Sequence, residues 1–310
     1  MLSVKNIIDI DDLNVEDINL IMENTDSFRE VLERDLKKVP TLRGKTIVNL
    51  FFESSTRTKT SFELAAKRLS ADLINFSVAT SSLKKGESII DTIKTIQSMI
   101  IDLLIIRHSD SGVINFIARN IDTTIINAGD GKHQHPTQAL LDLYTIKKAF
   151  SSFKDLKVAI VGDIVNSRVA RSNMRLFKKM GMNVTLVSAP MLIPEDLSYF
   201  DVNVVSNIDE IIKDIDVLYM LRMQFERQDR KYYPSIMEYN RFLGLDSSRL
   251  EMMKKDSIVM HPGPVNRGIE IGEDVINLED KIPDRIKISN QVSNGVAVRM
   301  ALVYLILINQ

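Results

Sequence analysis

Short apolar segments alternate with amphipathic segments along most of the chain, and this rhythm constrains the fold more than any other feature. The apolar segments have the length of buried strands, and the amphipathic ones carry apolar residues at helical spacing. Strands that alternate with helices form parallel sheets with helices on both faces. The strands are expected at residues 47–52, 73–78, 102–106, 124–127, 156–161, 184–188, 202–206, 217–220 and 258–260.

The pattern restarts after a polar break at residues 151–155. Because 310 residues are enough for two cores, we predict an α/β protein with two consecutive domains, each a parallel sheet flanked by helices. The first domain is expected over residues 1–150 and the second over 151–291. The last helix, expected at 295–308, is apolar nearly all round and should be buried.

Local signals predict where several helices begin and end. Asn14 can cap a helix together with Asp17 three residues later. Pro136 suits a first helical turn and follows an expected loop at residues 128–135. Gly181 is expected to end a helix that covers residues 167–180.

Composition excludes several classes of function. The net charge is −1, whereas a nucleic-acid or membrane-surface partner would require a strong basic excess. The chain has no cysteine, so disulfides, thiolate metal sites and a cysteine nucleophile are excluded, and a cytoplasmic location fits. No secretory signal is visible, and the most apolar stretches, 99–106 and 300–308, are too short to span a bilayer.

Residues 51–63 read F-F-E-S-S-T-R-T-K-T-S-F-E, a strand that runs into hydroxyls and cations before a helix. A helix start presents backbone N–H groups and a positive dipole end, and Arg57 and Lys59 add charged donors, so a compact anion such as phosphate is expected there. The alternative is an ordinary N-cap. Capping needs one hydroxyl, whereas six crowd this segment: Ser54, Ser55, Thr56, Thr58, Thr60 and Ser61.

Further polar clusters also follow expected strands. In open α/β sheets, ligands bind beyond the carboxyl ends of the strands, so we expect these clusters to serve one site. They are Arg107, His135, Asp163 to Arg168, Arg222 to Gln224 and His261 to Pro264, and His108 has no assigned role.

Other interpretations of these clusters stay open on the residues alone. Arg107 can be a surface arginine at the end of a strand. His133, His135 and Asp130 can supply metal ligands, although the chain has only four histidines. The glycine of segment 162–168 suggests a dinucleotide site, but the G-x-G-x-x-G spacing is missing.

The S-T-R-T-x-T-S-F-E string resembles the carbamoyl phosphate signature of the aspartate/ornithine transcarbamoylase family. H-P-T-Q at 135–138, G-D-x-x-x-x-R at 162–168 and the segments that begin at Arg222 and His261 resemble its aspartate-specific branch. The matching motifs extend from Thr56 to Arg299. The resemblance implies that the C-terminal helix, at about 292–310, returns to the first domain.

The resemblance implies transfer of the carbamoyl group of carbamoyl phosphate to L-aspartate. The products would be N-carbamoyl-L-aspartate and phosphate, in the committed step of de novo pyrimidine biosynthesis, the route to UMP, without metal or cofactor. A transcarbamoylase for another amine, such as ornithine, is the nearest alternative. The ornithine enzymes carry a cysteine in the short segment that corresponds to 261–264, and this chain has none. A catalytically silent carbamoyl phosphate sensor is an alternative from another class.

The resemblance also assigns roles to residues. In the first domain it gives phosphate binding or carbonyl polarisation to Ser55, Thr56, Arg57, Thr58, Arg107 and His135, and a carbamoyl amide contact to Gln138. In the second domain it gives aspartate binding to Arg168, Arg222 and Gln224, and backbone contacts to Gly263 and Pro264.

Ser81 and Lys85 lie in a loop that would otherwise be interpreted as solvated. The resemblance makes them residues that a neighbouring subunit donates, which implies a homotrimer with shared active sites. Lys84 leaves an ambiguity of one position, and the K-G-E ending favours Lys85. Whether regulatory chains extend the assembly is not decided by the sequence.

Overall fold

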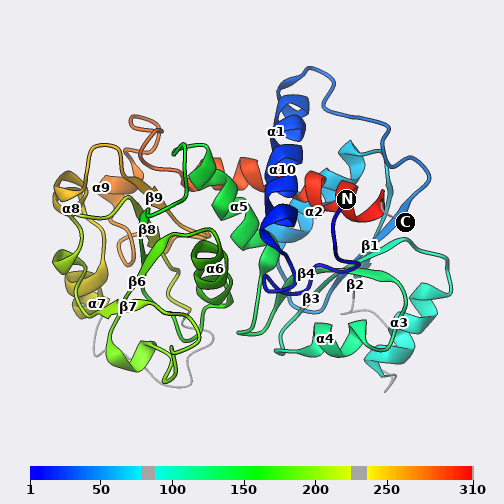
Figure 1. The fold of residues 1–310 in the computed structure, drawn as a ribbon, viewed down its shortest axis with the longest axis horizontal. Helices are drawn as coiled ribbons and strands as arrows, with labels where there is room; N and C mark the ends of the chain where they lie inside the picture. The colour runs from blue at the N-terminus through cyan, green and yellow to red at the C-terminus, as the bar shows by residue number, and fades with distance from the viewer. Residues whose placement is uncertain (78–87, 225–235, 309–310) are drawn as a thin grey trace. The chain divides into compact units, whose positions relative to one another are not determined.

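The computed structural model describes residues 1–77, 88–224 and 236–308, and the chain divides into two compact units (Figure 1). Unit 1 comprises Met1–Tyr144 and Ser293–Gln310, and unit 2 comprises Thr145–Val292. Each unit contains one sheet, and every strand pair within it is parallel. The predicted fold class, two successive parallel sheets flanked by helices, is confirmed.

The sheet of unit 1 has the strand order β2-β1-β3-β4. Helices α3 and α4 pack through their isoleucines on one face, and α1, α2 and α10 lie over the other (Figure 1). The elements are α1 Val15–Glu33, β1 Thr46–Phe51, α2 Thr56–Arg68, β2 Asp72–Ser77, α3 Ile89–Gln97, β3 Leu103–His108, α4 Val113–Ala118, β4 Thr124–Asp130, α5 Pro136–Lys147 and α10 Ile288–Leu307.

The expected start of α1 is confirmed, because Asn14 and Asp17 form a reciprocal capping box. The strand at 124–127 is longer than expected: β4 continues to Asp130, so the loop expected from residue 128 begins three residues later. The reason is a buried polar network. Asn127 Nδ2 donates to Asp130 Oδ1 at 3.0 Å, and Asp130 pairs with His108 across a register shift in β3.

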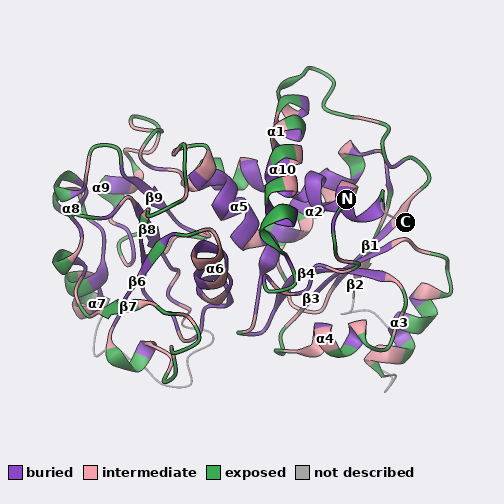
Figure 2. Cartoon of the chain, viewed as in Figure 1, coloured by how far each residue is buried: buried purple, intermediate pink, exposed green. Residues whose placement is uncertain are grey.

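The C-terminal helix, α10, begins at Ile288, seven residues before the expected start. Its first turns are polar, so the apolar periodicity did not predict them. From residue 294 onward the helix is buried, apart from the half-buried Val296 and Tyr304 (Figure 2). The ring of Tyr304 packs edge-on against Phe28 of α1, with 5.4 Å between the centroids, and Arg299 Nη1 donates to Ser61 Oγ of α2 at 2.9 Å. The implied return of this helix to the first domain is therefore confirmed.

The sheet of unit 2 has the strand order β7-β6-β5-β8-β9. Gly181, at φ +81°, ends α6 as expected: its N–H donates to Lys178 and that of Met182 to Phe177. Among the described helices, none combines the length and apolarity needed to cross a membrane. The elements of unit 2 are β5 Lys157–Val161, α6 Arg168–Lys179, β6 Asn183–Val187, η3 Pro190–Leu192, β7 Asn203–Val205, η4 Ile208–Glu210, β8 Val217–Met220, α7 Ile236–Leu243, α8 Ser247–Met252, β9 Ile258–Met260 and α9 Glu273–Ile276.

Candidate active site

In unit 1, the chain leaves β1 in one direction toward β2, while β3 lies on the other side of β1. The strand order therefore reverses between β1 and β3. Open α/β sheets bind ligands at such a topological switch point, beyond the carboxyl ends of the two strands. Phe51 pairs with Arg107, and Phe52 N donates to Arg107 O at 2.9 Å. The start of α2 and the end of β3 thus lie at the same edge of the sheet.

The start of α2 lacks the usual compensation of a helix N-terminus. Ser55 occupies the N-cap position, but its side chain makes no capping hydrogen bond, and the first turn contains no acidic residue. The positive end of the dipole is therefore not neutralised by these local groups. The interpretation of the hydroxyls as simple caps is wrong at Ser55, and the arrangement suits an external anion. Thr58 is buried, whereas Arg57 is exposed.

Arg107 is 8% exposed and is held from two sides. Its Nη2 donates to Glu53 Oε1 at 3.0 Å, and its Nη1 donates to Ala128 O of β4 at 3.3 Å. The guanidinium is thereby fixed between the segment after β1 and the neighbouring strand. Glu53 was not predicted as a site residue, although it lies inside the motif at residues 51–63. The position of this carboxylate, two residues before Ser55 of the predicted anion site, could have indicated that it holds an arginine.

His108 follows Arg107 and has a structural environment. Its Nδ1 accepts a hydrogen bond from Asp110 N at 2.9 Å, and its ring lies 5.0 Å from that of Phe52, centroid to centroid. Burial lowers the pKa of His108, so the imidazole stays neutral near pH 7 with its proton on Nε2. This fits the absence of any role for His108 in the sequence argument.

His135 lies directly before Pro136, the first residue of α5. Its carbonyl accepts from Gln138 N and Ala139 N, and its buried ring has Nδ1 at 3.4 Å from Thr137 Oγ1. Gln138 Nε2 donates to Asp142 Oδ1 at 2.9 Å. Because Nε2 is the atom of this amide that donates to Asp142, the carbonyl oxygen of Gln138 faces elsewhere.

His133 is placed between carboxylates. Its Nδ1 lies 3.0 Å from Asp130 Oδ2, and its Nε2 lies 3.6 Å from Asp9 Oδ1. Within residues 1–77, 88–224 and 236–308, no group of three or more histidines or carboxylates is arranged to hold a metal ion. The metal interpretation of His133, His135 and Asp130 therefore has no support in the part of the chain that is described.

Unit 2 has its own switch point, between β5 and β8. Val161 pairs with Met220, and Leu221 N donates to Val161 O at 2.8 Å. Segments 162–168 and 222–224 therefore leave the sheet side by side. β9 pairs with β8, which places segment 261–264 at the same edge.

Gly162 permits the close approach of these segments. It has φ +119°, and a Cβ there would meet Tyr239 Oη at 2.7 Å and Leu221 O at 3.3 Å. We expect Gly162→Ala to lower the free energy of unfolding by about 3 kcal/mol or more, from strain and overpacking together. Gly181→Ala is the control, because its φ is also positive but the nearest atom would be 3.8 Å away. Denaturant midpoints of the two variants should differ clearly; equal midpoints would show that Gly162 is not crowded.

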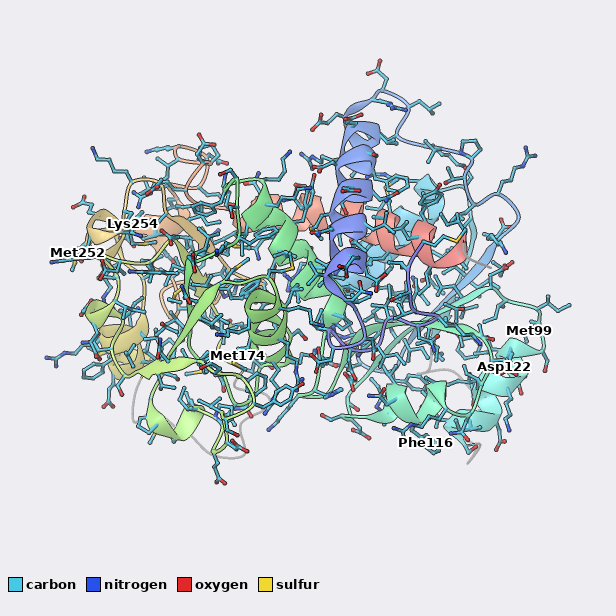
Figure 3. The ribbon with its side chains drawn as sticks, in the orientation of Figure 1. Met99, Phe116, Asp122, Met174, Met252 and Lys254 are labelled. Atoms are coloured by element: carbon cyan, nitrogen blue, oxygen red, sulfur yellow. The ribbon has the colours of Figure 1, made fainter. Side chains whose placement is uncertain are left out.

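Segment 162–168 leads into α6 through a buried polar turn. Asn166 Nδ2 donates to Asp163 Oδ1 at 2.8 Å, and Ser167 Oγ caps the helix by accepting from Ala170 N at 3.1 Å. Arg168, the first residue of α6, is 4% exposed. Met174 of the same helix is fully buried (it is labelled in Figure 3).

Segment 222–224 is anchored through its middle residue. Arg222 and Gln224 are half-buried, and the buried Met223 between them donates its N–H to Glu270 Oε1 at 2.6 Å. In segment 261–264, Gly263 N donates to His261 Nδ1 at 2.8 Å, which tightens the turn before the exposed Pro264. Glu270 was not predicted from the sequence, because it lies 47 residues from Met223 and outside every motif named above.

The predicted site residues thus lie in two sets, one near the carboxyl ends of the strands of each sheet. The unit 1 set contains Ser55, Thr56, Arg57, Thr58, Arg107, His135 and Gln138, and the unit 2 set contains Arg168, Arg222, Gln224, Gly263 and Pro264. Ser81 and Lys85 lie outside the described residues. Their roles stay predictions.

Known proteins of one enzyme family match this chain over nearly its whole length. The aspartate/ornithine carbamoyltransferase carbamoyl-P binding domain matches residues 5–148, and the Asp/Orn binding domain of the same family matches residues 154–306. An aspartate carbamoyltransferase catalytic subunit from Campylobacter hominis is 52% identical over 299 residues, which cover 96% of each chain. The corresponding subunit from Magnetococcus marinus is 49% identical over 306 residues, 97% of this chain and 92% of its own.

Solved structures agree with the sequence relatives. Aspartate transcarbamoylase from Trypanosoma cruzi in complex with N-(phosphonacetyl)-L-aspartic acid superposes with a TM-score of 0.89 at 30% identity, covering 98% of this chain and 96% of that one. The same enzyme in complex with carbamoyl phosphate and aspartate gives a TM-score of 0.85 at 29% identity, again covering 98% and 96%. The resemblance inferred from the motifs is confirmed. This chain belongs to the aspartate/ornithine carbamoyltransferase family.

Proposed function

We propose that this protein transfers the carbamoyl group of carbamoyl phosphate to the amine of L-aspartate, giving N-carbamoyl-L-aspartate and phosphate. The observation that carries the proposal is the meeting of the uncapped start of α2 with the clamped Arg107 at the switch point of unit 1. The choice of aspartate is supported by the names of relatives that are about half identical to the chain. The product would enter de novo pyrimidine biosynthesis.

Unit 1 would bind carbamoyl phosphate. The start of α2, with Ser55, Thr56, Arg57 and Thr58, supplies hydroxyls, backbone N–H groups and one cation to the phosphate. Arg107 is rigidly held, so it can donate to a phosphate oxygen and to the carbonyl oxygen without reorganisation.

The carbamoyl group itself would be recognised from the start of α5. A neutral His135 can donate to the carbonyl oxygen that gains negative charge in the transition state. The carbonyl oxygen of Gln138, which the hydrogen bond to Asp142 turns away from that carboxylate, is suited to accept from the carbamoyl NH₂.

Unit 2 would bind aspartate. Arg168 and Arg222 provide two guanidinium groups, and a guanidinium pairs with a carboxylate through two parallel hydrogen bonds, so two of them match a dicarboxylate. Gln224 would assist Arg222, and the Gly263-Pro264 turn offers backbone carbonyls to the ammonium and carbamoyl NH₂ groups.

The chemistry that we propose is positioning and charge stabilisation rather than covalent catalysis. The aspartate amine attacks the carbonyl carbon, the C–O bond to phosphate breaks, and phosphate departs with the bonding electron pair. The departing phosphate accepts the proton that the amine loses. No separate general base is then required.

A side-by-side assay of amine acceptors tests this function. Phosphate release from carbamoyl phosphate is expected to depend on L-aspartate and to yield N-carbamoyl-L-aspartate, with L-ornithine giving little turnover. Preference for ornithine would move the protein to the other branch of the family. No release with either amine would contradict the function.

We also propose a cytoplasmic homotrimer in which Ser81 and Lys85 enter the site of a neighbouring subunit. The proposal rests on the family resemblance alone, because both residues lie outside the described part of the chain. Sedimentation equilibrium should give three times the mass of 35.2 kDa; a monomer that is fully active would contradict shared sites.

A further inference from the structure

The two segments proposed to bind aspartate share one buried carboxylate, that of Glu270. On one side, Oε1 accepts from the backbone N–H of Met223 at 2.6 Å. Met223 lies between the two side chains proposed to contact the substrate, Arg222 and Gln224. Since Leu221 N is already fixed to β5 at 2.8 Å, Glu270 provides the next anchor of this segment after the end of β8.

On the other side, Glu270 holds the segment that follows the Gly263-Pro264 turn. Asn266 N donates to Oε2 at 2.8 Å, and Asn266 Nδ2 donates to Oε1 at 2.7 Å. The same Nδ2 atom also donates to Met223 O at 3.2 Å, so Asn266 links the two segments directly as well.

Burying the carboxyl group of Glu270 costs free energy, so its presence at this link needs a reason. The residue is fully buried, and burial raises the pKa of its carboxyl, while the hydrogen bonds from Met223, Asn266 and its own backbone N–H oppose the rise. A leucine or methionine would fill such a position at no electrostatic cost. A buried carboxylate that accepts from two separate segments instead specifies their relative position.

We propose that Glu270 is a positioning residue for the amine substrate: it sets the spacing between segment 222–224 and the Gly263-Pro264 turn, and thereby the affinity for the dicarboxylate. The inference rests on the proposed function and adds to it a residue that does not touch either substrate.

The test compares Glu270→Gln and Asn266→Ala with the wild-type protein in steady-state kinetics. Glutamine keeps one acceptor oxygen but places an NH₂ group against one of the two segments. Asn266→Ala removes the side-chain contacts of the same link. Both variants are expected to raise KM for aspartate by about 10- to 100-fold, the effect of losing hydrogen bonds to a charged group. The KM for carbamoyl phosphate should change by less than about twofold.

Asp216→Asn is the matched control. Asp216 precedes β8 at the opposite end of the strand, where it accepts from Lys157 N at 2.8 Å and from Lys254 Nζ at 2.6 Å (Lys254 is labelled in Figure 3). This variant removes a charged hydrogen-bond acceptor from the same unit, so it should lower the melting temperature and leave both KM values unchanged.

The outcomes separate the role of Glu270 from the function itself. If the folded Glu270→Gln and Asn266→Ala proteins keep the wild-type KM for aspartate, or raise both KM values equally, the positioning role is overturned. Should Glu270→Gln fail to fold, the Asn266→Ala result alone decides. Absence of aspartate-dependent turnover in the wild-type protein, measured first, would overturn the proposed function and this inference together.

Discussion

Arg57→Ala is expected to lower turnover by at least about 10²–10³-fold while the protein stays folded. Arg57 is exposed in the first turn of α2, so its loss removes a cation from the proposed phosphate site without opening a cavity in the core. The measurement is kcat in the carbamoyl transfer assay, together with the circular dichroism melting curve.

Arg68→Ala provides the control on the same helix. Arg68 lies in the last turn of α2, where a cation stabilises the helix dipole by about 0.3–1 kcal/mol. We expect a slightly lower melting temperature and wild-type turnover. If Arg57→Ala turns over as fast as Arg68→Ala, Arg57 has no part in the mechanism.

Gln138→Glu is expected to reduce activity near pH 8 by roughly 100-fold, as for the loss of one oriented polar contact to the reacting group. As the pH falls, the variant should regain part of the lost activity. The substitution replaces an NH₂ donor, 2.9 Å from Asp142 Oδ1, with a second carboxylate. Two carboxylates this close cannot both be ionised without a large cost, so the pair takes up a proton with a raised pKa. At lower pH the protonated carboxyl group introduced at position 138 would again donate to Asp142, as the amide does.

The double variant Gln138→Glu with Asp142→Asn tests this explanation. The amide introduced at position 142 would donate to the new carboxylate at position 138, which restores one hydrogen bond and the net charge of the pair. Activity should return to within about tenfold of wild type and lose the added pH dependence. A double variant no better than Gln138→Glu would show that the hydrogen bond between positions 138 and 142 does not orient the amide.

Signals confined to a few neighbouring residues predicted much of the fold correctly. The Asn14 and Asp17 capping box, the helix start at Pro136 and the end of α6 at Gly181 all depend on contacts within a few positions of each residue. The apolar strands were placed to within a few residues because buried parallel strands are almost continuously apolar.

Contacts between distant residues were not predictable in the same way. Glu53 meets Arg107 because β1 and β3 are neighbours, and Glu270 meets Met223 because the chain returns to the end of β8. Strand order decides the first pair and the path of the segment after β9 decides the second, and periodicity reveals neither. The polar start of α10 was missed for a related reason: Gln291 is buried because its Oε1 accepts from His261 N, 30 residues away.

Titration with N-(phosphonacetyl)-L-aspartate, the ligand in the Trypanosoma cruzi complex, tests most directly whether the residues of both units act on one pair of substrates. The molecule carries a phosphonate and a dicarboxylate in one skeleton. We predict tight binding to the wild-type protein, and at least about tenfold weaker binding to each of two folded variants, Arg57→Ala in unit 1 and Arg222→Ala in unit 2. Unchanged affinity in either folded variant would contradict the account.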